Sequence, residues 1–117
     1  MRYIILSINY GGHDTSAALM INGEIVAACE QERFDLIKHS RNFPLEAINE
    51  CMQIANISIN DIDLCILPFD FDFHIKEKYL KPIINDKVSM SFLINDLDRI
   101  KEIANSKNLI RDNLNYK

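Results

Sequence analysis

Hydrophobic residues near the start of the chain form a short, almost continuous run that ends in glycine. Residues 3–9 read Tyr-Ile-Ile-Leu-Ser-Ile-Asn, and Gly11-Gly12 follow one residue later. A run of this length that is rich in β-branched residues is typical of a buried central strand. We therefore predict a central strand at 3–9 with a Gly-Gly turn at its carboxyl end, a position where functional groups often gather.

The next two segments predict a β-hairpin. Strands are expected at residues 16–21 and 24–30, and the pair Asn22-Gly23 separates them. A two-residue Asn-Gly pair supplies the positive φ angles of a type I′ turn, which joins antiparallel strands. The hairpin is the clearest local prediction in the sequence.

A helical pattern follows the charged stretch 31–41. Pro44 suits a first helical turn, because its missing N–H would have no partner there. Apolar side chains then recur on one helical face, which predicts a helix that packs on the sheet. These side chains are Leu45, Ile48, Met52 and Ala55.

The second half of the chain gives a weaker pattern. Residues 62–67 are expected to form another strand that ends at Pro68. We predict mostly loop at 69–90, a helix at about 91–106 and a frayed tail at 108–117. The expected fold class is α/β with a mixed α+β sheet, in the order β-β-β-α-β followed by a C-terminal helix.

Composition places the chain among ordinary globular domains. It has 117 residues, of which 48% are hydrophobic and 26% charged, enough for one domain with a real core. The net charge of −4 and the lack of a Lys/Arg cluster argue against nucleic acid as a partner. No apolar run approaches the roughly 18 residues that span a bilayer, and no signal peptide is recognisable, so we expect no membrane contact and a cytoplasmic location. The three cysteines are odd in number and far apart, and we expect buried, reduced thiols at Cys29, Cys51 and Cys65.

Histidine and aspartate spacing gives no metal-ligand pattern. His39 and His74 lie on predicted loops without a matched ligand, so we interpret both as structural or surface residues. Asp70 and Asp72 have the Asp-x-Asp spacing of some metal sites, but the alternating Phe residues around them favour a strand end or turn. No metal site is predicted.

The Gly-Gly turn is the candidate binding site. Gly11 and Gly12 allow backbone N–H groups to approach a phosphate closely, and His13 and Thr15 add side-chain donors. A Gly-Gly pair between strands is more often just a turn. His13 is either a donor or proton carrier or an ordinary hydrogen-bonded histidine, and Asp14 either holds that ring or stabilises the turn.

Charge is concentrated just after the third predicted strand, over residues 30–34. Arg33 and Lys38 have the chemistry to bind a phosphate or carboxylate, and Arg is suited to bidentate contacts. Solvated ion pairs are the plainer interpretation, because such pairs are common on protein surfaces. Both interpretations stay open on spacing alone.

Three blocks in order resemble the nodulation-protein and antibiotic O-carbamoyltransferases. Residues 11–19 are similar to the His-Asp-x-Ser-Ala-Ala-Leu signature of that family, and residues 22–28 are similar to the hairpin that follows it. Three blocks with sensible gaps are far more specific than any one of them. The resemblance is good over 1–68 and poor over 69–117, which we treat as a loop and helix extension of the same domain. The third block consists of Gln31-Glu32-Arg33-Phe34, Lys38, Phe43-Pro44 and the helix that holds Ala47, Ile48 and Cys51.

The resemblance implies an actin-like, Hsp70-like (ribonuclease H-like) ATPase domain, similar to the universal tRNA-threonylcarbamoyl protein. Enzymes of this family use ATP and carbamoyl phosphate, join a carbamoyl group to adenylate, and transfer it to a hydroxyl acceptor. The resemblance implies that His13 and Asp14 are catalytic, with Glu32 as a neighbour of the cleft. It implies cofactor-binding roles for Gly11, Gly12, Thr15, Ser16, Arg33 and Lys38.

The chain departs from the family pattern in three respects. After Arg33-Phe34 the family continues with Thr or Ser and then Arg, whereas Asp35 and Leu36 stand here, with the loss of one cation. The divalent-metal-binding His-x-x-x-His helix of the family has no counterpart in this sequence. Family members are also several times longer. We therefore expect a truncated or split carbamoyltransferase that is inactive as this chain alone.

Two functions of other classes stay open. A non-catalytic interaction module would pair with a complementary protein chain that carries the missing half, and an unfinished sheet edge favours such pairing. A sugar-kinase or acetate-kinase type of phosphotransferase shares the superfold, but the His-Asp-x-Ser-Ala-Ala-Leu run argues against it.

Overall fold

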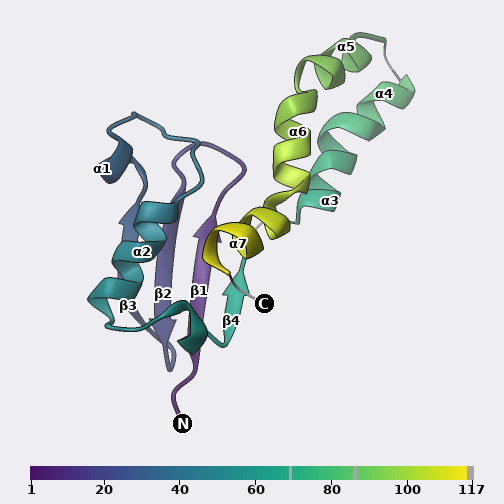
Figure 1. Cartoon of the computed structure of the whole chain (residues 1–117). Helices are drawn as coiled ribbons and strands as arrows, with labels where there is room; N and C mark the ends of the chain where they lie inside the picture. Colours follow the sequence, from purple (N-terminus) through teal and green to yellow (C-terminus); the bar gives the residue numbers. More distant parts are fainter. Residues whose placement is uncertain (69, 86, 116–117) are drawn as a thin grey trace.

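The structure, a computed structural model, has a four-stranded mixed sheet with the strand order β3-β2-β1-β4 (Figure 1). β2 runs antiparallel to β1 and β3, whereas β4 runs parallel to β1. This confirms the expected mixed α/β class. The strands are β1 (Ile4–Asn9), β2 (Ser16–Ile21), β3 (Glu24–Glu30) and β4 (Leu64–Ile66). The structure describes residues 1–68, 70–85 and 87–115.

The predicted hairpin between β2 and β3 is confirmed. Asn22 and Gly23 have φ angles of 51° and 88°, the positive values that a type I′ turn requires. The side-chain Oδ1 of Asn22 also accepts a hydrogen bond of 2.7 Å from the backbone N–H of Tyr3. The turn is thereby joined to the start of β1.

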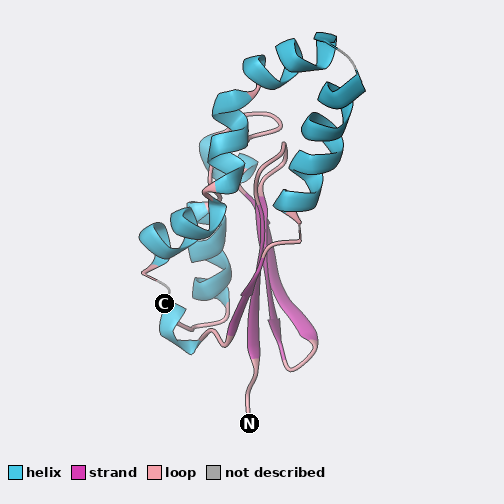
Figure 2. Ribbon diagram, turned by 90° about the vertical axis from the view of Figure 1, so that its right-hand side faces the viewer, coloured by secondary structure: helices cyan, strands magenta, loops and turns pink. Residues whose placement is uncertain are grey.

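One face of the sheet carries the core. Alternate residues of β1, namely Ile4, Leu6 and Ile8, are buried on this face. The helices α2 and α7 both lie against it (Figure 2). The predicted helix is confirmed as α2 (Leu45–Ile54), which follows the short helix α1 (Glu32–Asp35) and precedes the 3₁₀ helix η1 (Ile59–Asp61). The buried side chains from the helices are Ala47, Ile48 and Cys51 of α2, with Ile110 and Leu114 of α7.

The opposite face of the sheet stays open near its β4 edge. Leu64 and Ile66 point to this side and keep 41% and 40% of their surface exposed. On β3, the side chain of Ile25 is 69% exposed. The sheet therefore presents apolar surface that the described helices do not cover.

The prediction of loop over residues 69–90 is wrong for the described part of this segment, which forms an arm of helices that projects beyond the sheet (Figure 1). Residues 69 and 86 lie outside the described residues. The arm lengthens the molecule to 53 × 32 × 24 Å. It consists of α3 (Phe71–Ile75), the π-helical segment η2 (Lys76–Leu80), α4 (Lys81–Asn85), α5 (Lys87–Asn95) and α6 (Leu97–Ala104).

Local interactions explain why the arm is helical. Asp70 caps α3 by accepting a 3.0 Å hydrogen bond from the N–H of Phe73, so its role is an N-cap and not a strand end. Lys81 and Glu77 form a 2.6 Å ion pair one turn apart. Proline normally interrupts a helix, but Pro82 is the second residue of α4 and follows the wider π-helical segment η2 by one residue, where the usual hydrogen-bond pattern is already changed. No described helix is long and apolar enough to cross a membrane.

The helix expected at about 91–106 is divided, and the tail is ordered. α5 ends at Asn95 and α6 begins at Leu97, while Asp96 between them accepts a 2.7 Å hydrogen bond from the hydroxyl of Tyr79. The prediction of a frayed tail is wrong up to Leu114, because α7 (Ser106–Leu114) packs on the core. Residues 116–117 lie outside the described part of the chain.

All three cysteines are free thiols, as expected. Cys29 and Cys51 are buried, whereas Cys65 is only partly buried, which corrects the prediction of three buried thiols. Burial, followed by the neighbouring Cys29, raises the pKa of Cys51 to about 12. Burial also raises the pKa of Cys65 to about 11. These two side chains are therefore protonated at neutral pH and weakly nucleophilic.

Candidate functional site

The candidate site begins where β1 ends. The turn between β1 and β2 passes through Gly11 at a φ of 104° and Asp14 at a φ of 58°. Gly adopts such an angle without strain, and Asp is among the residues that tolerate the left-handed region. The side-chain amide of Asn9 closes the turn by donating a 2.9 Å hydrogen bond to the carbonyl oxygen of Asp14. This geometry turns His13 and Asp14 away from the core.

A second loop, residues 36–42, is fastened to the first through Thr15. The N–H of Thr15 donates to the carbonyl of Ser40 at 3.1 Å, and its hydroxyl donates to the carbonyl of Asn42 at 2.7 Å. Thr15 is buried. Its side chain therefore joins the two loops and does not supply the phosphate donor that we expected from the sequence.

Asp35 organises the second loop. Its carboxylate accepts hydrogen bonds from the N–H of Ile37 at 2.9 Å, the amide of Asn42 at 3.0 Å and the hydroxyl of Ser40. These bonds, that from Ser40 first, hold the pKa of Asp35 below its usual value. The residue that departs from the family pattern thus shapes the loop, a role that sequence reasoning missed.

Two imidazole rings meet at one carboxylate in the space between the loops. His13 Nδ1 lies 2.5 Å from Asp14 Oδ2, and His39 Nδ1 lies 3.0 Å from Asp14 Oδ1. The interpretation of His39 as a residue without a matched partner is therefore wrong. It failed because 25 residues separate His39 from Asp14 and only the folded loop brings them together.

The contacts of the cluster lower the pKa of Asp14 and raise that of His39. The hydrogen bonds from His13 and His39, in that order, hold the pKa of Asp14 below its usual value. The bond to Asp14 raises the pKa of His39, and the charge of Glu32 contributes less. Asp14 is therefore ionised at neutral pH, and the positive form of His39 is favoured beside it.

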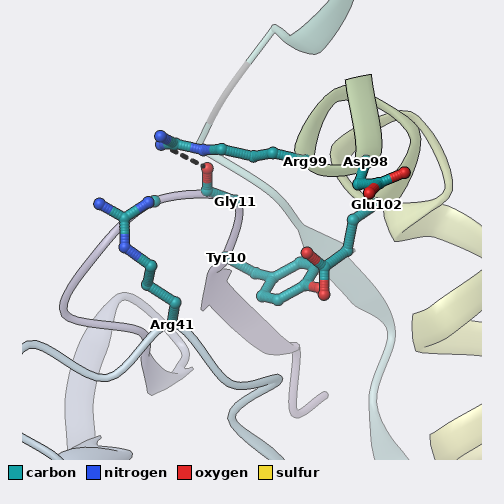
Figure 3. Close-up of a pocket in the computed structure, with 7 residues that line it drawn as sticks. Tyr10, Gly11, Arg41, Asp98, Arg99 and Glu102 are labelled. Carbon is teal, nitrogen blue, oxygen red and sulfur yellow. Dashed lines mark hydrogen bonds between the residues drawn. The ribbon is translucent and has the colours of Figure 1, made fainter. Parts of the chain in front are cut away.

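A cavity of about 440 Å³ lies beside the same turn (Figure 3). Arg99 reaches it from α6 and donates a 3.4 Å hydrogen bond to the carbonyl of Gly11, and Arg41 extends toward the turn from the second loop (Figure 3). Burial and the adjacent Glu102 raise the pKa of Tyr10, which stays a neutral hydroxyl. The lining residues are Tyr10, Gly11, Gly12, Arg41, Asp98, Arg99 and Glu102.

The structure brings together only part of the predicted site. Gly11 and Gly12 line the cavity, and His13 and Asp14 follow them directly in the same turn. The remaining predicted residues are not among those that line the cavity: Ser16 begins β2, Arg33 is exposed on α1 and Lys38 is exposed on the second loop. Sequence reasoning missed Arg99, because it lies 88 residues beyond Gly11 on a helix that was not expected to face the turn.

Comparisons with known proteins identify relatives of this chain. The family described as "Carbamoyltransferase N-terminus" matches residues 4–116. An uncharacterized protein of Synechocystis, sll1178, is 44% identical over 62 residues, which are 53% of this chain and 10% of that protein. Nodulation protein NolNO of Sinorhizobium fredii is 43% identical over 54 residues, which are 46% of this chain and 8% of that protein. An uncharacterized 19.2 kDa protein of Rhizobium etli is 37% identical over 51 residues, 44% of this chain and 30% of that protein. The matches thus span less than a third of each relative.

Proposed function

This chain belongs to the carbamoyltransferase N-terminus family, and from that premise we propose that it supplies the first part of the active site of an ATP-dependent O-carbamoyltransferase. Carbamoyl phosphate is the proposed carbamoyl donor, and a small-molecule hydroxyl is the proposed acceptor. The observation that carries the proposal is the turn after β1, where a cavity with two arginines adjoins a histidine held by a carboxylate. We further propose that the sheet is the first layer of an actin-like, Hsp70-like ATPase domain.

The cavity has the chemistry to bind a phosphate. The guanidinium groups of Arg41 and Arg99 supply positive charge, and the Gly11-Gly12 backbone leaves room for a close approach. Asp98 and Glu102 also line this cavity, and their negative charges repel a bound anion. The lining therefore holds two charges of each sign, and we propose that this chain alone binds the nucleotide weakly and that the rest of the enzyme completes the cleft.

His13 has the geometry of a general base. Asp14 contacts its Nδ1, which leaves Nε2 free to take the proton of an acceptor hydroxyl. In the proposed transfer the acceptor oxygen forms a bond with the carbamoyl carbon, the bond from that carbon to the adenylate oxygen breaks, and AMP leaves. Asp14 stabilises the imidazolium that forms, and the guanidinium groups of Arg41 and Arg99 stabilise negative charge on the phosphate.

The divalent metal of the family is not assigned a step. Its His-x-x-x-His ligands are absent from the sequence. In the described part of the chain, the one set of three potential ligands is His13, Asp14 and His39, which comes from two loops and not from one helix. The residues therefore do not fit the metal helix that the family resemblance implies.

Removal of either cavity arginine tests the proposed phosphate site. In an enzyme assembled from this chain and the remaining domains of a carbamoyltransferase relative, we expect Arg41→Ala and Arg99→Ala each to raise the KM for ATP or carbamoyl phosphate about tenfold or more. The reason is the loss of a charged hydrogen bond to phosphate. Initial rates of carbamoyl transfer at varied substrate concentration provide the measurement.

Two further variants make this experiment specific. Arg111→Ala removes an exposed charge from α7 and should leave both KM values unchanged. Arg33→Ala tests the cofactor-binding role that the family resemblance implies for this residue of α1. If Arg41→Ala and Arg99→Ala behave like Arg111→Ala, the cavity does not hold the phosphate.

The open face of the sheet favours a second candidate function, a non-catalytic module that pairs with another chain. Leu64, Ile66 and Ile25 present apolar surface there. Such a module would need this face and not the histidine cluster. Association with a complementary chain that is lost on Ile66→Lys but kept on His13→Ala, with no transfer activity in the wild-type pair, would favour the module.

A further inference from the structure

We propose that His13, Asp14 and His39 form a binding site for one divalent transition-metal ion. Each residue offers one ligand atom, and these three atoms lie within 4.8 Å of one another. The side chains of His13 and His39 are 67% and 63% exposed, so an ion can reach them from solvent. The site goes beyond the proposed function, which uses no metal.

The ligand set matches the chemistry of these ions. Two imidazoles and one carboxylate bind Zn²⁺ and Fe²⁺ in many proteins, and three protein ligands leave at least one position open. Zn–N and Zn–O bonds of about 2.1 Å in tetrahedral geometry place two ligand atoms of one ion about 3.4 Å apart. The three atoms here lie within 4.8 Å of one another, so the widest pair must close by up to about 1.4 Å, which rotation of an exposed imidazole supplies.

Backbone contacts join the two loops that carry the three ligands. The hydrogen bond from Thr15 N–H to Ser40 C=O joins the residue after Asp14 to the residue after His39. Asp14 and His39 both occupy the left-handed region, with φ angles of 58° and 56°. The side chains of these two residues meet across the joined loops, where His39 Nδ1 lies 3.0 Å from Asp14 Oδ1.

The location gives the ion a chemical use. His13 directly follows Gly12, which lines the cavity with Arg41 and Arg99. An ion with an open position near this cavity would be suited to an oxygen ligand from a phosphate or carboxylate group. The ion and the proposed proton transfer both use the ring of His13. Occupancy of the metal site would therefore control whether this ring is free to accept a proton from the acceptor hydroxyl.

Titration of the chelator-treated chain with Zn²⁺ or Co²⁺ alone tests the site. We expect one ion per chain by isothermal titration calorimetry, and visible Co²⁺ bands without the intense absorption of a cobalt–thiolate bond. Asp14→Asn and His39→Asn should each weaken binding about 100-fold or more, because each removes a direct ligand. Asn tolerates the left-handed backbone at both positions, so the loops keep their conformation.

The controls separate this site from other metal-binding groups and from the proposed function. The chain has three histidines, and His74→Gln on α3 should leave the affinity unchanged. Arg41→Ala should also retain metal binding, whatever its effect on phosphate. Circular dichroism checks that each variant is folded, and His13→Gln provides a second ligand variant. The proposal is overturned if the wild-type chain binds no ion, if His39→Asn and His13→Gln bind as well as wild type, or if the Co²⁺ spectrum shows thiolate ligation.

Discussion

Replacement of His13 by alanine is expected to lower carbamoyl transfer by about 10²–10⁴-fold in an enzyme that contains this chain and the remaining domains of a carbamoyltransferase relative, the usual contribution of a general base. His13 is the exposed imidazole whose Nδ1 contacts Asp14 at 2.5 Å, so its loss removes the proposed proton acceptor without disturbing the core. Initial rates at saturating ATP and carbamoyl phosphate measure the change in kcat.

The matched control is His74→Ala on the helical arm, which should retain full activity. Thermal unfolding of both variants tests whether the fold is intact. Turnover by His13→Ala within a factor of a few of wild type would remove this residue from the active site. The cavity arginines would then be the remaining candidates for the chemistry of the turn.

A large loss of stability is expected from Leu19→Ala. Leu19 lies in the middle of β2, opposite Leu6 of β1, and is fully buried beneath the helices. Truncation of a buried leucine costs about 2–5 kcal/mol through lost burial and the cavity that is left. Because domains of this size unfold at a cost of about 5–15 kcal/mol, the variant should unfold at a clearly lower urea concentration.

Ile25→Ala provides the comparison for this stability measurement. Its side chain on β3 is 69% exposed, so the expected change in unfolding free energy is within about 0.5 kcal/mol. Urea unfolding followed by circular dichroism gives both values. Equal losses for the two variants would contradict the assignment of the core to the face that α2 and α7 cover.

The sequence was sufficient to predict those parts of the structure that depend on local patterns. The Asn22-Gly23 turn, the alternating burial along β1 and the apolar face of α2 each follow from the chemistry of a few neighbouring residues. Gly11 and Gly12 could be assigned to the candidate site for the same reason, because a glycine turn directly after a central strand is visible in the sequence.

Contacts between distant segments explain what the sequence could not predict. The pattern of residues 106–114 is polar, and only its packing on β1 and neighbouring strands shows why Ile110 and Leu114 are apolar. The arm was missed because Pro82 suggested a break, whereas a π-helical turn accommodates it. His39 and Arg99 reach the turn after β1 through loop 36–42 and α6, so their roles depend on folding and not on spacing.

Nuclear magnetic resonance of the ¹⁵N-labelled chain, titrated with carbamoyl phosphate and separately with ATP, tests the central claim that the turn after β1 forms the phosphate part of a carbamoyltransferase site. The amide signals of Gly11, Gly12, His13, Asp14 and Arg41 are expected to shift together. The dissociation constant is expected to be in the millimolar range or higher, which is weak binding. Shifts confined to the second cavity on the arm, which Ile75, Leu80 and Ile84 line, or no shifts at the turn at the highest ligand concentration, would contradict the claim.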